Sequence, residues 1–125
     1  MSGILASPSV VPYLFYDDVD CAARFLEDAF GFQRVFESPD PAGGLARAQL
    51  EHGTGKVMLG KIGPGLRPVA SAQSLNALHG GVYVYVDDVD AHCDRARAAG
   101  AEVLLNPSDQ VDVEGQFWMF ARRLK

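Results

Sequence analysis

The sequence predicts an α+β protein built from two related β-α-β-β-β modules. The segment Asp17-Asp-Val-Asp20 recurs as Asp87-Asp-Val-Asp90, 70 residues later (17 to 87). A tyrosine stands four residues ahead of each copy, and an alanine-rich run that ends at a glycine follows each copy. An internal repeat of this size indicates the architecture before any single element is assigned.

The first module is expected over about 10–62. Aspartate is a favoured helix N-cap, so Asp17 or Asp18 should begin a helix that ends at Gly31, the residue type that best adopts a left-handed helix terminus. One strand is expected before this helix and three after it, separated by glycine- and proline-rich turns: 10–16, 32–37, 45–51 and 56–60.

Residues 63–80 contain glycines and prolines that break regular structure, and we expect them to be the linker. The second module is expected over about 81–123, with a strand at 81–86, a helix at about 89–99 and strands at 101–105 and 117–121. This module is shortened. Gly55 lies 24 positions after Gly31, whereas Gly115 lies only 15 positions after Gly100. The third strand of the second module is therefore expected to be a stub around 111–113, or missing.

Length and composition narrow the class of protein. A chain of 125 residues is expected to form a single domain, 1–125, and its net charge of −5 argues against nucleic-acid partners. The sequence has no apolar run of about 18 residues and no recognisable signal peptide, so we expect no membrane partner. The two cysteines, Cys21 and Cys93, are expected to be reduced thiols in a cytoplasmic protein.

Four blocks of the sequence carry a family resemblance. They are Val-Pro-Tyr-Leu-Phe-Tyr-Asp-Asp-Val-Asp from residue 11, Val-Met-Leu-Gly from residue 57, Gly-Val-Tyr-Val-Tyr-Val-Asp-Asp-Val-Asp-Ala-His from residue 81 and Asp-Val-Glu-Gly-Gln-Phe-Trp-Met-Phe from residue 112. In this order and spacing they resemble the vicinal oxygen chelate superfamily, the glyoxalase/bleomycin-resistance/dioxygenase group. The resemblance covers about 10–122.

This resemblance implies a curved mixed sheet that forms an open half-barrel around a cavity, helices on the outside of the sheet, and a homodimer. Because strand side chains alternate between faces, Tyr83 and Tyr85 are expected to face the cavity and the valines between them the helix. Arg47 and Gln49 are expected to add polar contacts if their side of the strand faces inward. The full set of ligand-cavity candidates is Val11, Tyr13, Phe15, Arg47, Gln49, Val57, Leu59, Tyr83, Tyr85, Phe117 and Met119.

Metal-dependent members of the superfamily place His, Gln or Glu at one position on each of four strands. By alignment of the repeated blocks, these positions fall on Val11, Leu59, Gly81 and Met119. None of these side chains supplies the imidazole or carboxylate ligand that divalent ions need. A shift of two residues would bring only His79 to the start of the second module, and neither His52 nor His92 is expected to join it. We therefore expect no metal and no cofactor.

The sequence leaves the function open among three hypotheses, and it identifies no catalytic residue. The first is a metal-free protein of the bleomycin-resistance type that binds a small, partly aromatic molecule in the cavity of a homodimer. The second is a glyoxalase-related lyase or isomerase, or a dioxygenase-type enzyme, with an unrecognised metal site or acid/base chemistry by Tyr83, Tyr85 or His79. The third is a dimerising module without a ligand.

Overall fold

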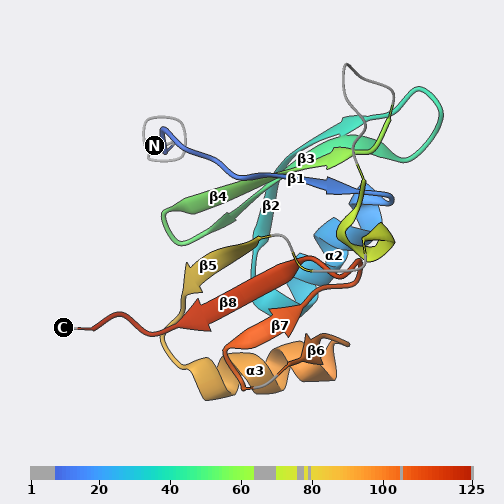
Figure 1. Cartoon of the computed structure of the whole chain (residues 1–125). Helices are drawn as coiled ribbons and strands as arrows, with labels where there is room; N and C mark the ends of the chain where they lie inside the picture. Colours follow the sequence, from blue (N-terminus) through green and yellow to red (C-terminus); the bar gives the residue numbers. More distant parts are fainter. Residues whose placement is uncertain (1–7, 64–69, 76–77, 79, 105, 125) are drawn as a thin grey trace.

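The structure, a computed structural model, describes residues 8–63, 70–75, 78, 80–104 and 106–124 (Figure 1). The first module contains five elements: β1 (Tyr13–Tyr16), α2 (Val19–Phe30), β2 (Gln33–Pro39), β3 (Leu45–His52) and β4 (Gly55–Lys61). The short 3-10 helix η1 (Ala72–Ser74) lies in the linker. The second module follows with five more: β5 (Gly81–Tyr85), α3 (Val89–Ala98), β6 (Glu102–Val103), β7 (Asp109–Val111) and β8 (Phe117–Ala121).

The two modules have the same sheet topology. The strand orders are β1-β4-β3-β2 and β5-β8-β7-β6, so the first strand of each module lies at a sheet edge next to the last one. These first and last strands pair in parallel, and the remaining neighbours are antiparallel. The result is an α+β fold with two four-stranded mixed sheets and no closed barrel, which confirms the α+β class and the two modules that the sequence predicted. Strand β7 comprises three residues and begins two residues before the expected stub.

The helices begin and end where the sequence predicted. Asp18 caps α2 by accepting a hydrogen bond from the main-chain N–H of Cys21, and Asp88 caps α3 through the N–H of Ala91. Gly31 ends α2 in the left-handed conformation, with φ of 79°. Neither helix in the described part of the chain has the length and apolar composition that a membrane crossing requires.

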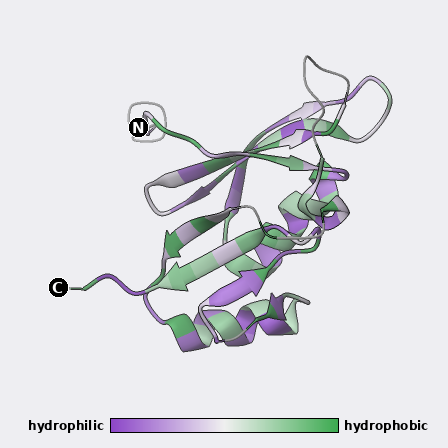
Figure 2. Cartoon of the chain, viewed as in Figure 1, coloured by the Kyte–Doolittle hydropathy of each residue, from purple (hydrophilic) through white to green (hydrophobic). Residues whose placement is uncertain are grey.

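A single hydrophobic core joins the two modules. The apolar side of α2 packs against β3 and β4, and α2 also contacts α3. Trp118 of β8 lies against Phe30 and Phe32, with ring centroids 5.5 and 5.4 Å apart, so an aromatic cluster crosses the boundary between modules. Strands β5 and β8 carry mostly apolar residues, whereas the short β7 is hydrophilic (Figure 2).

A buried carboxylate fixes the second module to the end of β1. Asp112 accepts hydrogen bonds from the Tyr16 hydroxyl at 2.5 Å, from Trp118 Nε1 at 3.0 Å and from the main-chain N–H groups of Glu114 and Gln116. Burial raises the pKa of Asp112 above its usual value, although these four hydrogen bonds act in the opposite direction. The Glu114 carboxylate accepts from the N–H groups of Asp17 and Asp18 at the start of α2.

The prediction of which β4 side chains face the cavity was wrong by one residue. Val57 and Leu59 are 3% and 0% exposed and pack in the core, on the same side as Leu50 and Ala48 of β3. The opposite face of β4 carries Lys56, Met58 and Gly60 instead. The apolar run from Val57 to Leu59 contains no polar residue to mark the alternation, and packing against α2 decides which residues turn inward.

Candidate functional site

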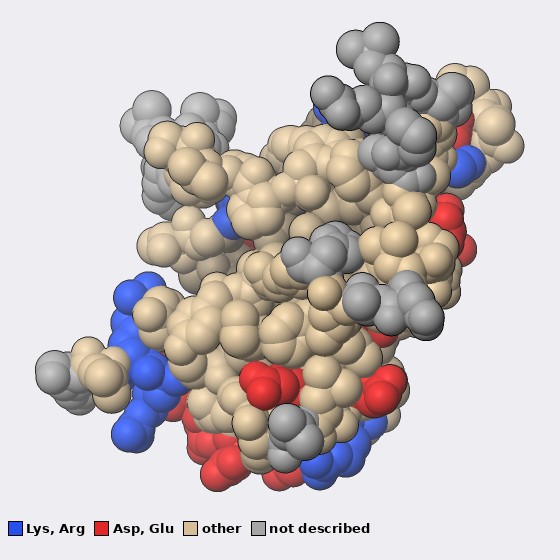
Figure 3. Space-filling model, viewed as in Figure 1, with Lys and Arg blue, Asp and Glu red and all other residues tan. Residues whose placement is uncertain are grey.

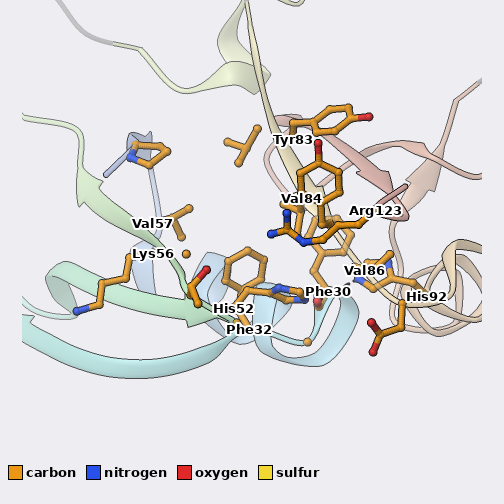
Figure 4. Close-up of a pocket in the computed structure, with 18 of the residues that line it drawn as sticks. Phe30, Phe32, His52, Lys56, Val57, Tyr83, Val84, Val86, His92 and Arg123 are labelled. Carbon is orange, nitrogen blue, oxygen red and sulfur yellow. Dashed lines mark hydrogen bonds between the residues drawn. The ribbon is translucent and has the colours of Figure 1, made fainter. Parts of the chain in front are cut away.

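The described residues line a partly open pocket of about 730 Å³ between the two modules. Its walls come from the β3–β4 hairpin, the end of α2, the edge strand β5 and the start of α3 (Figure 4). We call it the inter-module pocket. Its side-chain lining is aromatic, aliphatic and basic, with two aspartates: Val10, Phe30, Phe32, His52, Lys56, Val57, Val82, Tyr83, Val84, Tyr85, Val86, Asp87, Asp88, His92, Arg95 and Arg123. A volume of this size matches those of small-molecule sites in proteins.

Two histidines line this pocket although they lie far apart in the sequence. Phe32 contacts the ring of His52, with centroids 5.2 Å apart, and His92 stacks on Phe30 at 5.9 Å. Burial lowers the pKa of both histidines below the usual value of 6.5, so both rings are neutral at pH 7. His92 Nε2 lies 3.0 Å from the main-chain carbonyl of Phe30, and its Nδ1 is buried without a hydrogen-bond partner. The two neutral rings extend the aromatic wall.

Three basic residues border the pocket, and their surroundings differ. Lys56 forms an ion pair with Glu51 at 3.5 Å and points away from the pocket in Figure 4. Arg95 donates to the main-chain carbonyls of residues 27 and 28, at the end of α2. The guanidinium of Arg123 lies 4.4 Å from the ring centroid of Tyr85 and is directed toward the centre of the pocket (Figure 4).

Each sheet has one face that the core and the helices do not cover, which we call the open face. Strand pairing shows which residues share it. Tyr13 pairs with Met58, Gln49 with Met58 and Arg47 with Gly60, so these residues and Phe15 lie on the open face of the first sheet. On the second sheet, pairing between β5, β7 and β8 gathers another set: Gly81, Tyr83, Tyr85, Asp109, Val111, Phe117, Met119 and Ala121.

The open faces expose aromatic rings. Tyr13, Phe15, Tyr83 and Tyr85 are 44%, 41%, 55% and 45% exposed. In Figure 3 the middle of the face in view is largely uncharged, whereas Lys and Arg gather beside the C-terminus and charged residues of both signs lie along the lower edge. Several exposed aromatic side chains that share a sheet face are typical of a binding surface rather than of a solvent-facing wall.

The structure brings together only part of the predicted site. Val57, Tyr83 and Tyr85 line the inter-module pocket, whereas Leu59 is in the core. The other strand candidates lie on the open faces of two separate sheets: Tyr13, Phe15, Arg47, Gln49, Phe117 and Met119. Val11 is half-buried just before β1, and His79 lies outside the described residues.

Sequence reasoning missed several residues of the pocket: Phe30, Phe32, His52, His92 and Arg123. Phe30 and Phe32 flank the glycine that ends α2, and neither histidine was expected to join His79 in a site. Arg123 follows the last predicted strand by two residues. Continuing the alternation of β8 past Ala121 would have placed Arg123 beside Met119 on the open face.

The four positions aligned with the family's metal ligands do not fit a metal. Leu59 lies on the opposite face of the sheet from Tyr13, and Val11 and Met119 have no imidazole or carboxylate. A Cβ added at Gly81 would lie 2.6 Å from the ring of Phe117, so that ring fills the space beside the strand. Among the described residues, no three His, Cys, Asp or Glu side chains gather closely enough to hold an ion.

Comparisons with known proteins identify the family of this fold. The family model described as the Glyoxalase/Bleomycin resistance protein/Dioxygenase superfamily matches residues 8–121. No curated protein sequence matches significantly. The structure is similar to that of TioX from Micromonospora sp. ML1, with 31% identity, a TM-score of 0.73 and coverage of 94% of this chain and 99% of that one.

Two more distant structures share the fold. A gene product from Arabidopsis thaliana is 20% identical with a TM-score of 0.72, covering 92% of this chain and 98% of that one. The fosfomycin resistance protein FosX from Listeria monocytogenes, in a complex with Mn(II) and a sulfate ion, is 15% identical with a TM-score of 0.69, covering 94% and 93%. The family match spans both modules, and the chain therefore belongs to the glyoxalase/bleomycin resistance protein/dioxygenase superfamily.

Proposed function

We propose that this protein is a metal-free binding protein that holds a small, partly aromatic molecule in a cavity formed across a homodimer. The observation that carries the proposal is the set of aromatic rings left uncovered on the open faces. Tyr13 and Phe15 lie with centroids 5.2 Å apart on one sheet, and Tyr83 and Tyr85 lie 5.4 Å apart on the other. Stacking on such rings contributes about 0.5–1.5 kcal/mol per pair beyond the burial of area.

A second copy of the chain is the covering partner that we propose. An open sheet face rich in aromatic residues needs another layer, and a two-fold symmetric dimer supplies one from the same surface. Arg47 and Gln49 lie on the open face of the first sheet with Tyr13. In the proposed cavity they are the polar groups that orient a ligand among apolar walls.

The absence of a metal is also part of the proposal. It rests on the residues themselves: an apolar side chain or glycine stands at each aligned ligand position. The Phe117 ring beside Gly81 supports it, since a ligating side chain at 81 would compete with that ring for space. Binding of this kind needs no catalytic residue. The two unpaired cysteines, Cys21 and Cys93, fit a location in the cytoplasm.

Native mass spectrometry of protein purified without added metal or chelator tests the proposal. We expect a dimer that carries an organic adduct, whose mass identifies the ligand, and no stoichiometric metal. A dimer that carries one divalent ion per site would instead support an enzyme of the lyase, isomerase or dioxygenase type. A dimer that never retains or takes up a small molecule would indicate a dimerising module.

A further inference from the structure

We propose that the inter-module pocket is a second ligand site, complete within one chain, that binds planar aromatic acids with Arg123 receiving the anionic group. This goes beyond the proposed cavity between two copies, with which the pocket shares Tyr83 and Tyr85, because the walls of this pocket come from both modules of a single chain.

The shape and lining of the pocket favour a flat apolar ligand. Val57, Val84 and Phe32 are 3%, 8% and 6% exposed, so the part of the pocket that they line is continuous with the core. His52 and His92 add neutral aromatic rings beside them. Planar apolar molecules gain most from such walls, because ring–ring contacts add to the free energy of area burial.

The charge at the pocket favours an acid. In the part of the chain that the structure describes, no ion pair involves Arg123, and its guanidinium rests on the ring of Tyr85 at 4.4 Å. The N–H donors of a guanidinium lie at the edge of its plane, where a carboxylate or sulfonate accepts two of them. The other two cations, Lys56 and Arg95, already contact Glu51 and main-chain carbonyls.

The two acidic residues of the pocket lining, Asp87 and Asp88, do not pair with the Arg123 guanidinium. The Asp88 carboxylate is the N-cap of α3, where it accepts from the Ala91 N–H. Asp87 is exposed. Its negative charge raises the pKa of His52, although burial of the His52 ring has the larger effect and lowers that pKa. Neither aspartate forms an ion pair with Arg123 among the described residues. An acid bound at Arg123 therefore replaces water rather than a protein carboxylate.

Two probes of matched shape test the charge requirement: 2-naphthoate and the neutral 2-naphthamide, titrated into the native protein by calorimetry. Arg123→Gln should weaken naphthoate binding about fivefold, as loss of an exposed charge-assisted hydrogen bond would, and leave naphthamide binding unchanged. Arg122→Gln is the matched control. It removes the same charge from the preceding, exposed residue, which does not line this pocket, and should change naphthoate affinity less than twofold.

Amide chemical shifts locate the bound probe. With naphthoate, we expect the largest changes at residues 52–57 and 82–86, and Phe15→Ala should have no effect, since Phe15 is on the open face outside this pocket. Equal losses of naphthoate affinity in the Arg123→Gln and Arg122→Gln variants would show a general charge effect and overturn the proposal. Shifts confined to the open face of the first sheet, abolished by Phe15→Ala, would also overturn it while leaving the dimer cavity in place.

Discussion

The hydroxyl of Tyr16, at the end of β1, donates a hydrogen bond of 2.5 Å to Asp112, in the loop between β7 and β8. The two residues belong to different modules and are 1% and 7% exposed. Because Asp112 also accepts from Trp118 Nε1, one carboxylate connects the first strand of the first module with the last strand of the second. These hydrogen bonds therefore hold the first sheet and the second sheet in one position relative to each other.

Replacing Asp112 by alanine should destabilise the protein by about 3 kcal/mol or more, because it leaves several buried donors without an acceptor. Tyr16→Phe should cost about 1.5–3 kcal/mol, since the carboxylate keeps its other three donors. Urea unfolding measures both values. Asp94→Ala, at a side chain that is 80% exposed, is the control and should stay within about 0.5 kcal/mol of the unchanged protein. An Asp112→Ala variant as stable as this control would contradict the structural role.

The histidines of the inter-module pocket predict a loss of stability in mild acid. Burial lowers the pKa of His52 and His92 in the folded state, so the unfolded chain binds more protons once the pH falls below about 6.5. The stability that these histidines contribute is fully present above that pH and is lost as the pH falls through the folded values. We expect the free energy of unfolding to drop between pH 7.5 and pH 5.5.

Asp112 and Glu114 change the free energy of unfolding with pH in the opposite direction. Burial raises the pKa of both carboxyls in the folded state, so their contribution is present below the ordinary values of 3.8 and 4.5 and is lost as the pH rises through the folded ones. The double variant His52→Gln/His92→Gln separates the two effects, since it keeps the carboxyls. It should lose the drop between pH 7.5 and 5.5, and an unchanged slope in this variant would rule out the histidines as its source.

The elements that local chemistry determines were predictable from the sequence. The caps at Asp18 and Asp88 and the left-handed Gly31 depend on residues within a few positions of each helix end. The repeat then predicted two related β-α-β-β-β modules, and the matching strand orders of the two sheets confirm this. In contrast, the face of β4 that turns toward the core depends on which of Val57, Met58 and Leu59 packs against α2. An unbroken apolar run does not reveal that choice.

The inter-module pocket was not predictable for a related reason. His52 and His92 lie on a hairpin and a helix of different modules, and only the packing of α2 against α3 brings them to one pocket. Nothing in the spacing of these residues encodes that arrangement. The open-face residues were easier to identify, because alternation along β1, β3, β5 and β8 depends on local geometry alone.

Gly81 should tolerate no side chain. A Cβ there would lie 2.9 Å from the Phe117 carbonyl oxygen as well as 2.6 Å from its ring, and the main chain of a paired strand cannot move aside as a ring can. We expect Gly81→Ala to cost about 1–3 kcal/mol in thermal or urea unfolding. Gly80→Ala is the matched control, because a Cβ at the preceding residue meets nothing within 4 Å, and it should be nearly neutral. Equal stability of the two variants would show that the Phe117 ring and strand do not crowd this position.

The proposed cavity predicts that aromatic residues of the second sheet carry ligand affinity. Tyr85→Ala and Phe117→Ala should each weaken binding of the small molecule that copurifies with the protein by about tenfold, since each removes one stacking partner and its buried area. Circular dichroism checks that both variants remain folded, and calorimetry measures their affinity. Val113→Ala shortens an apolar side chain that is 44% exposed in the β7–β8 loop, outside the paired strands, and should bind as the unchanged protein does. Tyr85 also supports Arg123 in the inter-module pocket, whereas Phe117 does not line that pocket. A loss in Tyr85→Ala alone would therefore assign the copurified molecule to the inter-module pocket, and unchanged affinity in both variants would remove the second sheet from the site.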